Sequence, residues 1–221
     1  MHLRPILSAM LRNKTGAILV GLQIALTLAV VANAVFIIMQ RVEKIGRPSG
    51  VDSENLIFVQ SYGYGPNYNH RETVRHDLSL IRALPGVVAA SVTNGVPLSG
   101  GGSATIYRAT PNRDKENVLA NYYEVDEQGV EAFGVKLSAG RPFTEAEIQY
   151  SVEPNSDFVP SIIITEAMGR KLFGDEPALG KTVYDTLGHS AVVVGVISHM
   201  LGAWVDWDDL ESVAFHSRIS S

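Results

Sequence analysis

The chain has 221 residues, of which 46% are hydrophobic and 19% charged, and its formal net charge is -5. An apolar fraction this high with so little charge excludes a disordered chain and allows one domain with a real core. The sequence contains no cysteine, which excludes disulfides and cysteine-ligated metal sites. The mild acidity argues against nucleic acid as a partner, because binding phosphates requires a basic excess.

Charge and hydropathy divide the chain into a basic, apolar head and an acidic body. Residues 1–47 carry six Lys or Arg and one Glu, whereas the remaining 174 residues carry 12 Lys or Arg and 22 Asp or Glu. No charged residue occurs from Thr15 to Gln40. A helix of that length rises about 39 Å, more than the roughly 30 Å hydrocarbon core of a bilayer. We therefore predict a transmembrane helix over 15–40, with Thr15 and Gln40 as its boundaries.

The alternative to a membrane anchor is a cleaved signal peptide, because Ala32-Asn33-Ala34 fits a small-residue cleavage site. The apolar run continues beyond this site through Met39, which favours an uncleaved anchor. Three Lys or Arg flank the run on each side, so the positive-inside rule does not decide its orientation. The free amino terminus and Glu43 favour a cytoplasmic N-terminus over residues 1–14. That edge carries basic side chains suited to lipid headgroups or a partner protein: Arg4, Arg12 and Lys14.

After a linker over 41–50, the sequence predicts a strand–helix–strand unit. The apolar, β-favouring run Asn55–Gln60 predicts the first strand, and Val87–Val92 the second. Between them Asn69 is a helix-capping residue, with Glu72 three residues further on. Pro85-Gly86 ends that helix. The loop before it has three tyrosines that could anchor a partner or pack locally: Tyr62, Tyr64 and Tyr68.

The second half alternates strand and helix patterns after a glycine-rich stretch, Ser99–Ser103, which predicts a mobile loop. Extended segments are expected at Thr105–Ala109, Tyr122–Val125, Ser161–Ile164 and Ala191–Ile197. Helical turns are expected over Glu127–Phe133, and from a Thr165 cap to Phe173, stopped by Gly174. We therefore expect an α+β class: one N-terminal transmembrane helix, followed by a mixed domain of two subdomains built from strand–helix–strand units.

No motif indicates catalysis or a bound cofactor. The sequence lacks the phosphate-binding order GxxxxGK[ST] and the nucleophile elbow GxSxG. The histidine pairs His70 and His76, and His189 and His199, are not spaced to place two imidazoles on one helical face. We expect no enzyme activity, no metal and no cofactor. An anchored enzyme is the least favoured alternative, since it would need a nucleophile or metal site that these residues do not indicate.

An acidic cluster lies beside the two tryptophans of the chain. Carboxylates are suitable ligands for Ca²⁺, but the order and glycine of an EF-hand loop are missing. We therefore expect a solvated acidic turn with anchoring tryptophans. Its members are Trp204, Asp206, Trp207, Asp208, Asp209 and Glu211.

Over roughly residues 5–200 the chain resembles the N-terminal half of a MacB-like, FtsX-type ABC-transporter permease: a membrane helix followed by the MacB-like periplasmic core domain. Four blocks in the family's order carry the resemblance, and one block alone would be weak. They are Leu84–Val87 with Val96–Ser99 (LPGV…VPLS), Phe133–Leu137 with Ala139–Thr144 (FGVKL…AGRPFT), Ile164–Ala167 with Leu172–Gly174 and Leu179–Lys181 (ITEA…LFG…LGK), and Val193–Val196 (VVGV).

These motifs predict structural roles. Gly134, Gly140, Gly174 and Gly180 are expected at turns that need positive φ or close backbone approach. Arg141-Pro142-Phe143 places a charge beside an apolar anchor, which predicts a clip between the two subdomains. The resemblance assigns no catalytic role to any of them.

The resemblance implies a permease-type subunit in the inner membrane of a bacterium, with residues 51–221 as an extracytoplasmic core domain that is incomplete at its C-terminus. ATP would be hydrolysed on a separate cytoplasmic subunit, and the helix would pass that motion outwards. The implied partners are the lipid bilayer, the ATP-binding subunit, a second copy or second permease half, and a periplasmic protein. Family members continue into three more membrane helices, so we expect a truncated permease. The alternative is a single-pass anchored binding module with no transport activity.

Overall fold

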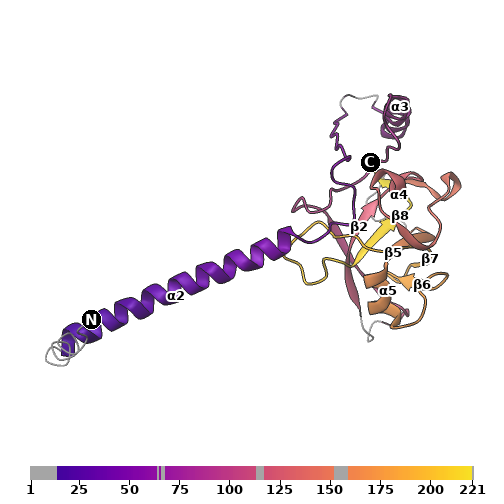
Figure 1. Cartoon of the computed structure of the whole chain (residues 1–221). Coiled ribbons are helices and arrows are strands. Elements are labelled where there is room, and N and C mark those ends of the chain that lie inside the picture. The colour runs from indigo at the N-terminus through magenta and orange to yellow at the C-terminus, as the bar shows by residue number, and fades with distance from the viewer. Residues whose placement is uncertain (1–13, 64, 66–67, 113–116, 152–158, 221) are drawn as a thin grey trace. The chain divides into compact units, whose positions relative to one another are not determined.

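The structure is a computed structural model, and it describes residues 14–63, 65, 68–112, 117–151 and 159–220 (Figure 1). The chain divides into two units, Met1–Pro48 and Ser49–Ser221. Helix α2 of the first unit, Lys14–Ile45, has 32 residues and none of them is buried. Within the described part of the chain it is the one helix long and apolar enough to cross a membrane.

Helix α2 is longer than the apolar run that predicts it. Thr15 and Gln40 both lie inside it, and the helix continues through Arg41–Ile45. A helix satisfies its backbone groups internally in lipid and in water alike, so it need not end where the apolar run ends. Pro48 then stops it from continuing. Arg4 and Arg12 lie outside the described residues.

The second unit is built on a seven-stranded mixed sheet with the order β1-β2-β8-β5-β7-β3, in which β6 also pairs with β7. The pairs β2–β8 and β5–β7 are parallel and the others antiparallel. A small parallel pair, β4–β9, lies apart from this sheet. The strands are β1 (Ser103–Tyr107), β2 (Val118–Glu124), β3 (Leu137–Gly140), β4 (Gln149–Ser151), β5 (Ser161–Thr165), β6 (Thr182–Tyr184), β7 (Ser190–Ile197), β8 (Val213–His216) and β9 (Arg218–Ser220).

Two hydrophobic cores lie on opposite faces of the main sheet, because alternate residues of a strand point to opposite sides. On β5, Ile164 belongs to one core and Ile163 to the other. Helix α5 (Glu166–Phe173) covers the first face with Met168. Phe133, which follows helix α4 (Gly129–Ala132), covers the second. The predicted α+β class is confirmed, but the two expected subdomains take the form of one compact unit with two cores.

The strand–helix–strand order expected for this domain occurs at β5–α5–β6. Thr165 caps α5 by accepting a hydrogen bond from the Met168 amide at 3.3 Å. Gly174, with φ of 65°, ends the helix. The predicted helix and both of its end signals are therefore confirmed. The strands predicted around Thr105–Ala109, Tyr122–Val125, Ser161–Ile164 and Ala191–Ile197 are also confirmed, with shifted ends.

The strand–helix–strand unit predicted over residues 55–92 is wrong in its strands. Helix α3 (His70–Arg82) forms with the predicted Asn69 cap, which accepts from the Glu72 amide. The segments 55–60 and 87–92 form no strand. A strand requires a neighbour for its backbone groups, and neither segment pairs with a described strand.

The glycine-rich segment 99–103 differs from the mobile loop expected from its composition. The Leu98 amide donates to the Gly202 carbonyl at 3.0 Å, and the Gly100 amide to the Ala203 carbonyl at 2.9 Å. Ser103 already belongs to β1. Glycine permits this close backbone pairing between two loops, so the segment is tied to the domain at both ends.

Candidate functional site

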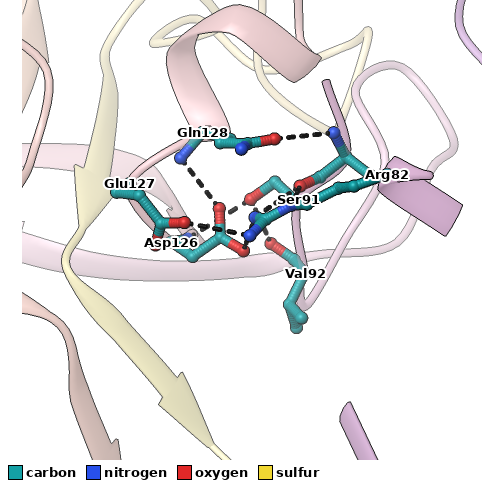
Figure 2. Close-up of polar contacts among 7 residues, drawn as sticks. Arg82, Ser91, Val92, Asp126, Glu127 and Gln128 are labelled. Carbon is teal, nitrogen blue, oxygen red and sulfur yellow. Dashed lines mark hydrogen bonds and ion pairs between the residues drawn. The ribbon is translucent and has the colours of Figure 1, made fainter. Parts of the chain in front are cut away.

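A clamp of hydrogen bonds and ion pairs centred on Arg82 holds helix α3 to the sheet domain (Figure 2). The Arg82 guanidinium lies 2.8 Å from the Asp126 carboxylate and 3.0 Å from that of Glu127. Its Nε and Nη2 also donate to the Ala90 carbonyl at 3.0 and 2.7 Å. One side chain therefore joins the end of α3, the segment after it and the chain that follows β2.

Backbone groups complete the Arg82 clamp. The Gln128 side-chain oxygen accepts a hydrogen bond from the Ala90 amide at 3.1 Å. The Gln128 amide donates to the Asp126 carboxylate at 2.9 Å, as Figure 2 shows. Ser91 accepts the Asp126 amide at 3.3 Å. Burial raises the pKa of the Asp126 carboxyl, and Ser91 and Arg82 act in the opposite direction. Ser91 and Arg82 therefore stabilise the ionised form of the Asp126 carboxyl.

Helix α3 and the segments beside it leave apolar side chains uncovered. None of the residues of α3 is buried. Of the three tyrosines in the predicted loop, Tyr62 is exposed. The Tyr68 hydroxyl lies 3.3 Å from His70 Nδ1. Tyr64 lies outside the described residues. Exposed large apolar residues in this region are Ile57, Phe58, Val59, Leu80, Leu84 and Val88. Within α3 the apolar residues at helical spacing, Val74, Leu78 and Ile81, are half-buried, whereas Leu80 and, just after the helix, Leu84 are exposed.

The four motif glycines have positive φ, the conformation that the sequence predicts for them: 64° at Gly134, 78° at Gly140, 65° at Gly174 and 78° at Gly180. They differ in their surroundings. A Cβ on Gly140 would overlap the Val194 carbonyl oxygen, whereas Gly174 and Gly180 have open space. Gly140 therefore combines both reasons for a glycine, since β3 approaches β7 closely at this point.

The Arg141-Pro142-Phe143 motif makes a local clip. Phe143 is buried in the second core, whereas Arg141 lies outside and holds Glu147 of η1 (Glu145–Glu147) through two hydrogen bonds of 2.7 and 3.0 Å. Glu147 also accepts from the Ser161 hydroxyl at 2.9 Å. The clip therefore joins β3, η1 and β5 within one unit rather than two subdomains.

The Glu147 contacts make stability depend on pH. The Arg141 hydrogen bond holds the pKa of Glu147 well below its usual value of 4.5. A lowered folded pKa contributes stability that is present above pH 4.5 and is lost as the pH falls towards the folded pKa. Glu147→Gln should therefore be less stable than the parent protein at neutral pH. The difference in unfolding free energy between the two should shrink as the pH falls below 4.5. Urea unfolding followed by tryptophan fluorescence measures this, with Glu145→Gln in the same turn as control. A difference that does not change with pH would contradict it.

A buried tyrosine–histidine pair was not predicted from the sequence. The Tyr107 hydroxyl lies 2.6 Å from His216 Nε2, and the His216 ring stacks on Tyr122 with centroids 4.7 Å apart. Burial lowers the pKa of His216 to about 3, so the imidazole is neutral at pH 7. The partners are far apart in sequence and flank no motif, so only the fold brings them together. Tyr107 and His216 are both buried, and Tyr107 belongs to the first core.

The remaining predicted candidates do not converge on one centre. His189 Nδ1 lies 3.0 Å from the Asp185 carboxylate. Trp204 and Trp207 pack together with ring centroids 4.5 Å apart, and Asp209 of the acidic cluster pairs with Lys171. Across the described residues, no three His, Cys, Asp or Glu side chains are arranged to hold a metal ion.

Comparison with known proteins places the whole arrangement in a family. Two curated relatives, the macrolide export ATP-binding/permease proteins MacB of Neisseria meningitidis serogroup A and serogroup B strains, are each 27% identical over 177 residues. The match covers 79% of this chain and 25% of each relative, so the chain spans about a quarter of the length of the curated relatives it matches.

Solved structures also match the chain. The extracellular domain of the noncanonic ABC-type transporter YknZ from Gram-positive bacteria is 20% identical, with a TM-score of 0.42, and the match covers 64% of this chain and 60% of that one. The periplasmic region of MacB from Actinobacillus actinomycetemcomitans gives the same identity and TM-score over 64% and 53%. The model of the MacB-like periplasmic core domain matches residues 23–220. The chain therefore belongs to the MacB-like periplasmic core domain family, found in permeases of ABC-type transporters.

Proposed function

We propose that the chain is a permease-type membrane subunit of an ABC transporter, in which α2 anchors the sheet domain on the extracytoplasmic side of the membrane. The observation that carries this proposal is the family match, which begins inside α2 and ends in β9. An apolar helix joined directly to this domain is the arrangement that an anchored external module needs. The N-terminus is then cytoplasmic.

In this proposal the chain has no enzymatic activity of its own. The curated relatives bear the description ATP-binding/permease, and the present sequence has no phosphate-binding GxxxxGK[ST] loop. We infer that ATP is bound and hydrolysed on another polypeptide, which α2 contacts at the cytoplasmic edge. No cofactor is needed on this chain.

The domain is suited to passing on movement as one body. Its central strands β5 and β8 are buried throughout, and both faces of the sheet carry a packed core. Close-packed cores transmit displacement with little deformation. A shift at the end of α2 would therefore move the whole domain, together with any substrate or external partner that it holds. Self-association, or pairing with a second permease half, would place two such domains side by side.

Co-purification tests the proposal. The full chain, tagged and extracted from native membranes in a mild detergent, should retain an ATP-binding protein, and the complex should hydrolyse ATP. An Arg12→Ala and Lys14→Ala double variant should retain less of it if the basic edge contacts this protein. Recovery of the chain without any ATP-binding protein, from membranes in which both are expressed, would contradict the transporter role.

The second candidate function is an anchored binding module that works without an ATPase. The exposed apolar residues beside α3 favour it, because a surface with side chains such as Ile57 and Val88 more than four-fifths exposed is typical of an interaction site. Cross-linking the full chain in membranes distinguishes the two. An extracytoplasmic protein captured without an ATP-binding protein would support this second function.

A further inference from the structure

The chain enters the sheet domain beside the segment 199–201. The Leu201 amide donates to the Ser49 carbonyl at 2.9 Å, and the backbone of Met200 leaves no room for a Cβ on Gly50. Ser49 follows Ile45, the last residue of α2, by four positions. Four residues span at most about 14 Å, so Ser49, with the Leu201 amide bonded to it, is separated from the last residue of α2 by only a short length of chain.

That loop carries two tryptophans in contact with each other. The Gly202 amide donates to the Leu210 carbonyl at 2.7 Å and closes the loop at its base. The Trp207 amide donates to the Trp204 carbonyl at 3.1 Å, which forms the turn that brings the two rings to a centroid distance of 4.5 Å. Both tryptophans are half-buried, and Val205 between them is 37% exposed.

A fourth apolar residue, Leu98, is held beside this loop in an unfavourable backbone conformation. Leu98 is the one non-glycine residue with positive φ, 59°, in the described part of the chain. Such a conformation is unfavourable for a bulky side chain and persists only where the surrounding structure holds it. Its amide bonds to the Gly202 carbonyl, and 37% of the residue is exposed. We call Leu98, Trp204, Val205 and Trp207 the tether-side patch.

The chemistry of the tether-side patch suits the boundary between lipid and water. Tryptophan has an apolar ring and one N–H donor, and it is enriched in the headgroup layer of membranes for this reason. Asp206 and Asp208 are exposed beside the patch, so negative charge disfavours contact with anionic lipid. We propose that the tether-side patch rests in the headgroup layer of the bilayer that α2 spans, on zwitterionic lipid. This inference rests on the membrane anchoring in the proposed function.

Intrinsic fluorescence tests the proposal directly, because the two tryptophans of the patch are the only two of the chain. The full chain is reconstituted into phosphatidylcholine vesicles with and without bromine near the headgroup end of the acyl chains. Bromine quenches fluorophores that it contacts, so most of the emission should be lost in brominated vesicles. Acrylamide added to the water should quench less in vesicles than in detergent. Anionic phosphatidylglycerol should weaken the bromine quenching.

Two matched variants separate a lipid contact from a general loss of structure. Leu98→Asn removes the apolar side chain but keeps a residue that tolerates positive φ, so bromine quenching should fall while stability is kept. Leu187→Asn changes an equally large residue, 63% exposed, at the turn before β7, and should leave the quenching unchanged. Equal effects of the two variants would contradict the patch.

The outcomes also distinguish this inference from the proposed function. If the chain floats with the vesicles but brominated lipid does not reduce the emission, the patch faces water or protein and the inference is overturned, while the anchor stands. If the chain does not float with the vesicles, both the anchor and the patch are overturned.

Discussion

Replacing Gly140 with alanine is expected to destabilise the domain by about 3–5 kcal/mol, because two penalties act at one residue. Its φ of 78° is unfavourable for any residue with a Cβ. The new Cβ would also overlap the Val194 carbonyl oxygen and lie 2.8 Å from the Gly195 Cα. Both obstacles are backbone atoms of β7, the strand on which β3 pairs, so neither can move aside without opening the sheet.

Gly180→Ala is the matched control. Gly180 has the same φ of 78° but open space around its Cβ position, so only the backbone strain applies. We expect a loss of about 1–2 kcal/mol for this variant. Guanidinium unfolding of the full chain in detergent, followed by fluorescence, measures both. Equal losses for the two glycines would show that the close approach of β3 to β7 is unimportant.

The second large effect is expected for Arg82→Ala, at about 2–3 kcal/mol. The Asp126 side chain is only 3% exposed, and without Arg82 its charge loses a partner at 2.8 Å. The Ala90 carbonyl would lose two donors at the same time. We expect a smaller loss of stability than for breaking a fully buried ion pair, because the Arg82 side chain is itself 26% exposed.

The segments that lose protection in Arg82→Ala show whether the Arg82 clamp holds α3. Hydrogen exchange should rise in α3 and in residues 83–92 of Arg82→Ala and stay unchanged in β5 and β7. Arg82→Lys should be intermediate, because an ammonium cannot serve both carboxylates and the carbonyl in a fixed fork. Arg75→Ala removes an exposed arginine from the same helix and is the control. If Arg75→Ala has the same effect as Arg82→Ala, the clamp does not hold α3.

Elements whose signals are local were predicted correctly from the sequence. Thr165 and Gly174 mark both ends of α5, and the apolar run of β7 is a strand in any context that buries it. Asn69 likewise marks the start of α3. These signals depend on hydrogen bonds within a few residues, so the sequence contains all the information they need.

Elements that depend on distant partners were mispredicted or missed. Ile57, Phe58 and Val59 favour a strand, yet all three are exposed, and the segment stays unpaired within the described chain. Conversely, β8 and β9 contain His216 and Arg218, whose polar side chains suggest the surface, although both residues are buried. Long-range contacts such as Tyr107–His216 at 2.6 Å decide these cases, and no local pattern reports them.

The place of β8 in the sheet sets the order in which the domain can fold during synthesis. Val213 pairs with Asn121 of β2, and Phe215 pairs with Ile163 of β5, so β8 is the strand that joins the two halves of the sheet. A ribosome makes β2 and β5 long before β8. Until residue 216 emerges, the nascent chain has two separate half-sheets with open edges, which are prone to aggregation and proteolysis. The domain must therefore complete its fold late, in a cooperative step dominated by long-range pairing.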